Sequence, residues 1–254
     1  MSSIPSSVRI KVDRANKHIV DLGAAIDKFF ERRPHSVVAY IDEEHKPTYC
    51  LKHIEPIDSA VSAVTGDVIQ NLRTALDYLA GALWLRTNSG EWKGYFPICE
   101  SSAGYKTEGV SKMHGMGQDA KDVIDGIEPY GGGKGDALWR LHSLSIIDKH
   151  RLPITMAGAN LGVHLPSFYP EMFSESATAN PWIVSVEDMR MPLKDGDILF
   201  RDDPGREIKT NVQIPFFVAL NEVGVLNCQP LVPALKNLVT AVDQAINNCA
   251  SLFT

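Results

Sequence analysis

Residues 57–86 read IDSAVSAVTGDVIQNLRTALDYLAGALWLR, and this stretch decides the fold. Apolar side chains recur in it at spacings of three and four, which places them on one face of a helix. They are Val61, Val64, Val68, Leu72, Ala75, Leu79 and Leu83. We therefore predict one long helix that follows Pro56 and stops at Asn88–Gly90.

The same helix carries a band of polar side chains where a plain core helix would be apolar. The band consists of Asp67, Gln70, Asn71, Arg73, Asp77 and Tyr78. Arg73 and Asp77 stand four residues apart, which lets them form a salt bridge on the helix surface. We interpret the band as one wall of a polar site between helices.

The remaining elements follow from periodicity and from the residues that interrupt it. Further helices are predicted over residues 8–31, 117–127, 137–151 and 229–253. Short strands are predicted over residues 36–41, 48–54, 154–156, 183–186, 198–201 and 209–220. The first two strands are joined by EEHKP, which indicates a β-hairpin.

Three connections carry their own predictions. Residues 88–115 are rich in Gly, Ser and Lys, and we expect an extended loop that is ordered only around Tyr95–Ile98. Residues 130–136 read YGGGKGD and predict a flexible connector, after which Asp136 caps the next helix. Asp195–Gly196 is typical of a turn between strands.

Helices thus fill the first part of the chain and strands the next, and a helix closes it. This segregation predicts an α+β fold: a bundle-like helical N-terminal half with a hairpin, a small, mainly antiparallel β region and a closing C-terminal helix. We expect a single domain over 1–254. Its subdivisions would be 1–152, 153–228 and 229–254, and the last helix would pack on the helical part.

Composition narrows the class of protein. The 254 residues are 44% hydrophobic and carry a net charge of −6, which is ordinary for a soluble globular chain and gives no support to a nucleic-acid partner. No apolar run is long enough to span a membrane, and the N-terminus lacks the apolar core of a signal peptide. Four scattered cysteines favour reduced thiols and a cytoplasmic location. We expect no membrane partner.

The densest polar run after the long helix is Asp148-Lys149-His150-Arg151. Basic residues in the last turn of a helix offset the negative end of its dipole, so a structural role explains them well. Alternatively, His150 acts as a general acid or base while Lys149 or Arg151 holds an anion. His142, two turns earlier, is a second candidate that packing also explains.

Arg14 and His18 present the same choice on the first helix, between a solvated polar face and a position near Asp77 or Asp67. Known site motifs are absent. GGGKGD lacks the Ser or Thr that follows the lysine of a phosphate loop, and no His or Cys spacing fits zinc. We expect neither a metal nor a cofactor.

Three segments of the sequence resemble a group of uncharacterised bacterial proteins. The segments are residues 14–18, RANKH; residues 70–78, QNLRTALDY; and residues 138–151, LWRLHSLSIIDKHR. In that group the patterns read RAxxH, HNLRSALDH and LWxLHxLxxIDKHR. The resemblance spans roughly the first 150 residues and implies no established activity.

A more distant resemblance is to HEPN domains, helical proteins in which an Arg and a His can cleave RNA without a metal. This sequence departs from that motif, because Tyr78 and Gln70 stand where histidines would be needed and Arg14 to His18 is one residue too short. Such a site would have to be assembled between helices from Arg73, His18 and His150.

Three hypotheses follow for function. The first is an inter-helix polar cluster with a structural role or a role in binding a small anionic ligand. Its members are Arg14, His18, Asn71, Arg73, Asp77, Asp148, Lys149, His150 and Arg151. The second is a metal-independent phosphodiesterase or ribonuclease at the same cluster, with His150 or His18 as acid/base and Arg73 and Arg151 on the phosphate. The third is a homodimer formed through the C-terminal helix.

Overall fold

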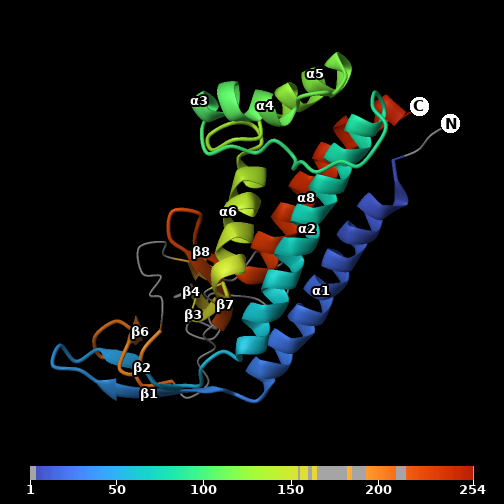
Figure 1. Ribbon diagram of the computed structural model, residues 1–254. Helices are drawn as coiled ribbons and strands as arrows, with labels where there is room; N and C mark the ends of the chain where they lie inside the picture. The colour runs from blue at the N-terminus through green and yellow to red at the C-terminus, as the bar shows by residue number, and fades with distance from the viewer. Residues whose placement is uncertain are drawn as a thin grey trace, which may run out of the picture. The chain divides into compact units, whose positions relative to one another are not determined.

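The structure is a computed structural model that describes residues 4–153, 155–159, 162–164, 182–184, 193–209 and 216–253 (Figure 1). The helices are α1 Ser6–Glu31, α2 Ser59–Leu85, α3 Ser102–Gly104, α4 Val110–Lys112, α5 Gln118–Ile127, α6 Asp136–His150 and α8 Leu231–Asn248. A π-helix, η1, spans Tyr105–Gly109, and a 3₁₀-helix, η4, spans Ala250–Phe253. The strands are β1 His35–Ile41, β2 Pro47–Ile54, β3 Thr155–Ala159, β4 Gly162–His164, β5 Trp182–Val184, β6 Ile198–Arg201, β7 Phe216–Glu222 and β8 Leu226–Pro230.

The predicted α+β class is confirmed by this order of elements. The chain divides into two units. Unit 1 comprises Met1–Gly23, Ser59–Ile154 and Leu220–Thr254, and unit 2 comprises Ala24–Asp58 and Thr155–Ala219. Among the described helices, none is both long and apolar enough to cross a membrane.

Unit 1 is built around the long helix α2, which packs against α6 and α8 (Figure 1). The predicted apolar stripe of α2 is buried except for the half-buried Val64, because its i, i+3 and i+4 positions face these neighbours. Gly66 lets α6 approach closely, since a Cβ placed there would lie 2.1 Å from Oδ1 of Asp148. The C-terminal helix α8 also buries its apolar face within this unit.

The segment after α2 corrects one prediction. Residues 102–112 are not an extended loop, because α3, η1 and α4 follow one another without a break. Ser101 starts this run by accepting a hydrogen bond from the Gly104 amide at 3.2 Å. Tyr105 then anchors it, because its ring is buried and its hydroxyl donates to Asp125 at 2.8 Å. The Gly- and Ser-rich composition concealed a helical segment held by these tertiary contacts.

The glycine-rich connector is a second correction. Residues 131–135 form a packed turn and not a flexible link: a Cβ at Gly133 would lie 2.5 Å from the Glu128 carbonyl oxygen, and one at Gly131 would lie 2.6 Å from that of Glu100. Asp136 does not cap α6 from outside, because it is the first residue of the helix. Its carboxylate instead accepts from the Gly132 amide at 2.9 Å and from Arg140 at 2.6 Å.

Unit 2 contains the predicted hairpin. β1 and β2 pair antiparallel with Val38 opposite Cys50, and β2 pairs antiparallel with β6, which gives the strand order β1-β2-β6. Asp42 shapes the hairpin turn, because its carboxylate accepts from the amides of Glu44 and Lys46. The turn at 195–196 is also as predicted, with Gly196 at a φ of 88°.

The remaining strands form two small sheets. One has the order β3-β7-β8, and the other is the antiparallel pair β4-β5. β4 and β8 were not predicted from the sequence. The predicted strands over residues 154–156, 183–186 and 209–220 fall partly outside the described residues.

Candidate functional site

The centre of the polar band on α2 is a buried ion pair. Arg73 is 6% exposed, and its Nη1 donates to Oδ1 of Asp77 at 2.5 Å. The i,i+4 spacing on α2 therefore brings the two side chains together as the sequence suggested. Burial pushes the pKa of Asp77 upward and that of Arg73 downward, while each charge opposes this shift in its partner.

This ion pair holds a stretch of backbone. The Phe96 amide donates to Asp77 Oδ1 at 2.8 Å, and the Phe96 carbonyl accepts from Arg73 Nη2 at 3.3 Å. Phe96 itself is fully buried. Both backbone groups of Phe96 are thus satisfied by one charged pair, as a neighbouring strand would satisfy them in a sheet. We call the ion pair and its bonds to Phe96 the Arg73–Asp77 clamp.

His142 of α6 completes the surroundings of the clamp. Its Nδ1 accepts a hydrogen bond from Arg73 Nε at 3.3 Å. A guanidinium can only donate, so Nδ1 carries the lone pair and the proton of the neutral ring lies on Nε2. Burial, followed by the charges of Arg73, Lys112 and Lys149, lowers the pKa of His142 to about 4. His142 is therefore uncharged at neutral pH.

Two lysines lie near this histidine, and a tyrosine lies near Arg73. Lys112 Nζ donates to the Ile98 carbonyl at 3.1 Å. Lys149 is exposed, and its ammonium forms no hydrogen bond or ion pair with a residue in the described ranges. Its positive charge opposes the rise that burial causes in the pKa of Asp77 and adds to the fall that burial causes in the pKa of His142. Tyr95 is 61% exposed, and its electrostatic interaction with Arg73 opposes the fall that burial causes in the pKa of the guanidinium. We refer to His142, Lys112, Lys149 and Tyr95 as the basic surface.

Asp148 and Asn71, two other members of the predicted cluster, form separate contacts. Gln70 donates through Nε2 to Asp148 at 2.9 Å and to the Ser145 carbonyl at 3.0 Å, which ties α2 to α6. Asn71 accepts from Lys11 at 3.4 Å and donates to the Asp67 carbonyl at 2.7 Å. Neither contact includes Arg73 or Asp77.

Arg151 is also engaged away from the clamp. Its Nη1 and Nη2 donate to the two carboxylate oxygens of Glu222 at 2.9 and 2.6 Å. Glu222 is 2% exposed, so this bidentate bond compensates a buried carboxylate. The bond raises the pKa of Arg151 further. Arg151 thus ties the end of α6 to β7.

The three remaining residues of the predicted cluster do not bond to the Arg73–Asp77 clamp. Arg14 and His150 are exposed and His18 is half-buried, and the structure gives their side chains no hydrogen bond or ion pair with any residue it describes. α2 and α6 run antiparallel, because Gly66 lies by Asp148 and Arg73 by His142. His150 therefore belongs to the Gly66 end of α2, away from Arg73. The predicted single cluster is in fact several separate contacts.

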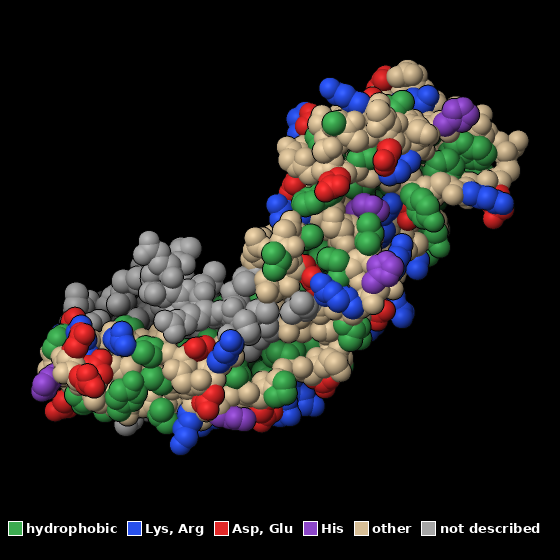
Figure 2. Space-filling view, turned by 60° about the vertical axis from the view of Figure 1, so that its left-hand side comes forward, with side chains coloured by type: hydrophobic (Ala, Val, Ile, Leu, Met, Phe, Trp, Pro, Cys, Tyr) green, Lys and Arg blue, Asp and Glu red, His purple; other side chains and the backbone are tan. Residues whose placement is uncertain are grey.

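The chemistry-bearing residues that sequence reasoning undervalued are His142 and Lys112. The sequence presents His142 as a second candidate that packing also explains, and Lys112 lies in a segment predicted to be a loop. Within the described residues, no group of three His, Cys, Asp or Glu side chains could hold a metal ion. Figure 2 shows basic and acidic side chains interspersed over one face, without a broad positive field.

Comparison with known proteins adds no assignment. No protein-family model matches the chain, and no curated protein or solved structure matches it either. The resemblances to the bacterial group and to HEPN domains therefore stay predictions from the sequence.

Proposed function

We propose that unit 1 is a binding module that holds a small anion, of the phosphate or carboxylate type, at the basic surface. The observation that carries this proposal is the state of His142. Arg73 occupies its Nδ1 lone pair, which leaves an Nε2–H as a fixed donor. A neutral donor with a fixed tautomer next to the charges of Lys112 and Lys149 suits a small anion.

The same state argues against acid–base catalysis by His142. A general base needs a free lone pair, and a general acid works best when its pKa lies near the working pH. His142 has its lone pair bonded to Arg73 and a pKa of about 4. The geometry therefore favours binding over proton transfer.

The Arg73–Asp77 clamp has a structural role in this proposal. The clamp fixes Phe96 against α2 and thereby restrains the backbone of the neighbouring Tyr95, a member of the basic surface. A carboxylate already satisfies Arg73, so the guanidinium is not the primary anion ligand. The ligand's charge would be met by Lys149 and Lys112.

The alternatives have less support. A phosphodiesterase built from Arg73, His18 and His150 needs those side chains close together. Arg73 instead pairs with Asp77, and within the described residues neither histidine bonds to it. A homodimer through the C-terminal helix needs a free apolar face, and α8 uses its own within unit 1. The homodimer and the cytoplasmic location stay predictions.

A titration with inorganic phosphate, and in parallel with a mononucleotide and short RNA, tests the proposal by NMR at low ionic strength. We expect saturable shifts at His142, Lys149 and Tyr95. Lys149→Gln should weaken phosphate binding about threefold, which corresponds to one partly solvated charge. Added salt should weaken it further.

Lys236→Gln is the matched control, because Lys236 is an exposed lysine of α8 outside the basic surface. Equal weakening by Lys236→Gln and Lys149→Gln would reveal diffuse charge attraction and overturn the anion site. RNA cleavage by the wild type, abolished in His150→Ala with the fold intact, would instead support the nuclease alternative.

A further inference from the structure

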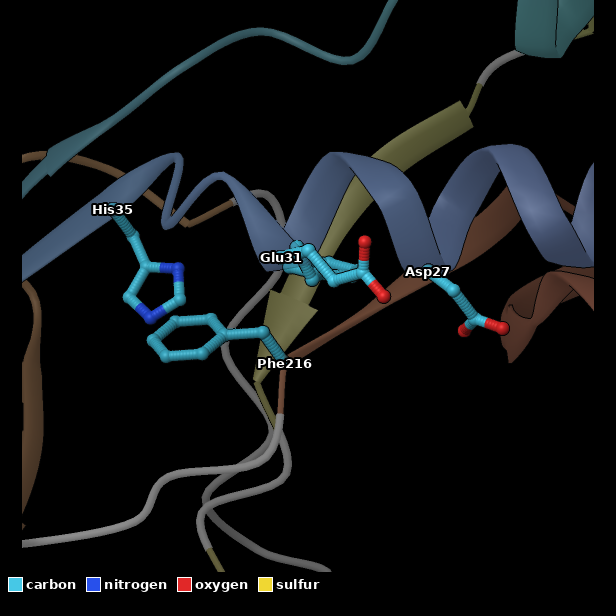
Figure 3. Close-up of a pocket in the computed structure, with 5 residues that line it drawn as sticks. Asp27, Glu31, His35 and Phe216 are labelled. Atoms are coloured by element: carbon cyan, nitrogen blue, oxygen red, sulfur yellow. The ribbon is translucent and has the colours of Figure 1, made fainter.

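Unit 2 contains a pocket that is lined by none of the residues considered so far. Its volume is about 510 Å³, and it is lined by Asp27, Phe30, Glu31, His35 and Phe216 (Figure 3). The first three belong to the last turns of α1, His35 begins β1, and Phe216 begins β7.

Aromatic rings form one wall of the pocket. The rings of His35 and Phe216 lie 3.8 Å apart between centroids, tilted by 33°, and Phe30 stacks on Phe216 at 6.5 Å. Figure 3 shows the imidazole and the phenyl ring of Phe216 against each other. The face of an aromatic ring carries negative electrostatic potential, which attracts cations.

Carboxylates form the other side. Asp27 and Glu31 are four residues apart on one face of α1, and both are exposed. Neither carboxylate forms a hydrogen bond or an ion pair with a residue that the structure describes. The nearby cation Arg32 is engaged with another ring, since its guanidinium carbon lies 5.6 Å from the Phe29 centroid. Among the described residues, the lining thus has two negative charges and no positive side chain.

His35 does not offset these charges. Its Nδ1 is buried and has no hydrogen-bond partner among the residues that the structure describes. Burial also lowers the pKa of His35, so the ring adds no positive charge at neutral pH. An unpaired polar atom in the wall of a pocket costs free energy, and such a cost is typical of binding sites.

We propose that this pocket binds an organic cation, whose ammonium or guanidinium group lies against the rings of Phe30 and Phe216 and pairs with Asp27 and Glu31. The source is either a free small molecule or a basic side chain of a peptide, and both offer the same chemistry. This site is independent of the proposed anion site, because it shares no residue with it.

Titrations with choline chloride and with a capped Gly-Arg-Gly peptide test the proposal, followed by the aromatic NMR resonances of Phe30, His35 and Phe216. We expect saturable shifts of these rings with at least one of the two probes, and the tighter probe identifies the source. The neutral isostere 3,3-dimethyl-1-butanol should bind at least about tenfold more weakly than choline, since it lacks the charge.

The variant Asp27→Asn/Glu31→Gln removes both charges and leaves the shapes intact. It should raise the Kd about tenfold, because each exposed carboxylate strengthens the binding of a cation about threefold. Asp13→Asn is the matched control, an exposed carboxylate of the same helix outside the pocket, and should leave the Kd unchanged. Absence of saturable shifts with both probes, equal binding of the neutral isostere, or an unchanged Kd in the double variant would each overturn the proposal.

Discussion

Two pairs of charged side chains, each with a spacing of four residues on a helix, differ in their burial and in their partners. Arg73 and Asp77 of α2 are buried, bonded to each other and closed over Phe96. Asp27 and Glu31 of α1 are exposed, carry like charges and line an open pocket. The spacing is the same, so the difference comes from the signs of the charges and from what packs on the helix.

Each region also contains a histidine whose pKa is lowered by burial. His142 accepts a hydrogen bond from Arg73, whereas Nδ1 of His35 has no partner in the described part of the chain. The polar groups around Arg73 thus support the fold, whereas those around the unit 2 pocket are available to a ligand. Three predictions probe this contrast.

The largest effect is expected for Asp77→Ala. This change leaves the guanidinium of Arg73 buried without its counter-ion and removes the acceptor of the Phe96 amide. We expect a loss of about 3–5 kcal/mol in the free energy of unfolding, measured by urea denaturation. Asp67→Asn, an exposed carboxylate of the same helix, serves as control and should change it by less than about 0.5 kcal/mol. A loss below about 1 kcal/mol for Asp77→Ala would contradict the clamp.

An intermediate effect is expected for the pH dependence that His142 imposes. Its pKa falls from the usual 6.5 of a free histidine to about 4 on folding, so the unfolded chain binds more protons between these values. The stability from neutral His142 is complete above about pH 6.5 and is lost as the pH falls towards 4. The full drop should be about 2 kcal/mol, after allowance for the ring's partial exposure.

Denaturation of the wild type and of His142→Asn at several pH values isolates this contribution. Asn retains an acceptor for Arg73 and does not titrate, so the difference between the two proteins should shrink below pH 6. His35→Asn should act in the same direction, because burial also lowers the pKa of His35. A difference that is constant with pH would show that His142 is not held neutral by the fold.

The smallest effect is expected for Glu31→Gln. Glu31 is the last residue of α1, where a negative charge opposes the helix dipole, and it has no partner in the described part of the chain. Removal of the charge should stabilise unit 2 by about 0.3 kcal/mol. A clear loss of stability in thermal denaturation would mean that Glu31 supports the fold and is not free for a ligand.

Much of the fold could be predicted because its periodic segments are long. The apolar stripe of α2, the terminal helix and the hairpin around Asp42 all follow from local pattern. Residues 102–112 could not be recognised as helical, because their order depends on tertiary contacts such as that of Tyr105 with Asp125. Local composition does not predict such contacts.

Only the contacts of the site that lie within one helix could be predicted from the sequence. The Arg73–Asp77 pair follows from spacing on one helix, and it forms. The contact with His142 depends on how α6 packs across α2, as does the separation of His150 from Arg73. The pocket of unit 2 joins residues almost 190 positions apart in sequence, Asp27 and Phe216, and no local pattern reports it.

The Phe96 amide proton has a further use. It is bonded to a carboxylate and not to a helical carbonyl, and the ring beside it is fully buried. Its exchange with solvent deuterium therefore requires the clamp to open, while the amides of α2 stay protected unless the helix itself unfolds. A single resonance thus gives the free energy of this local opening, which distinguishes release of the 95–98 segment from unfolding of the whole unit.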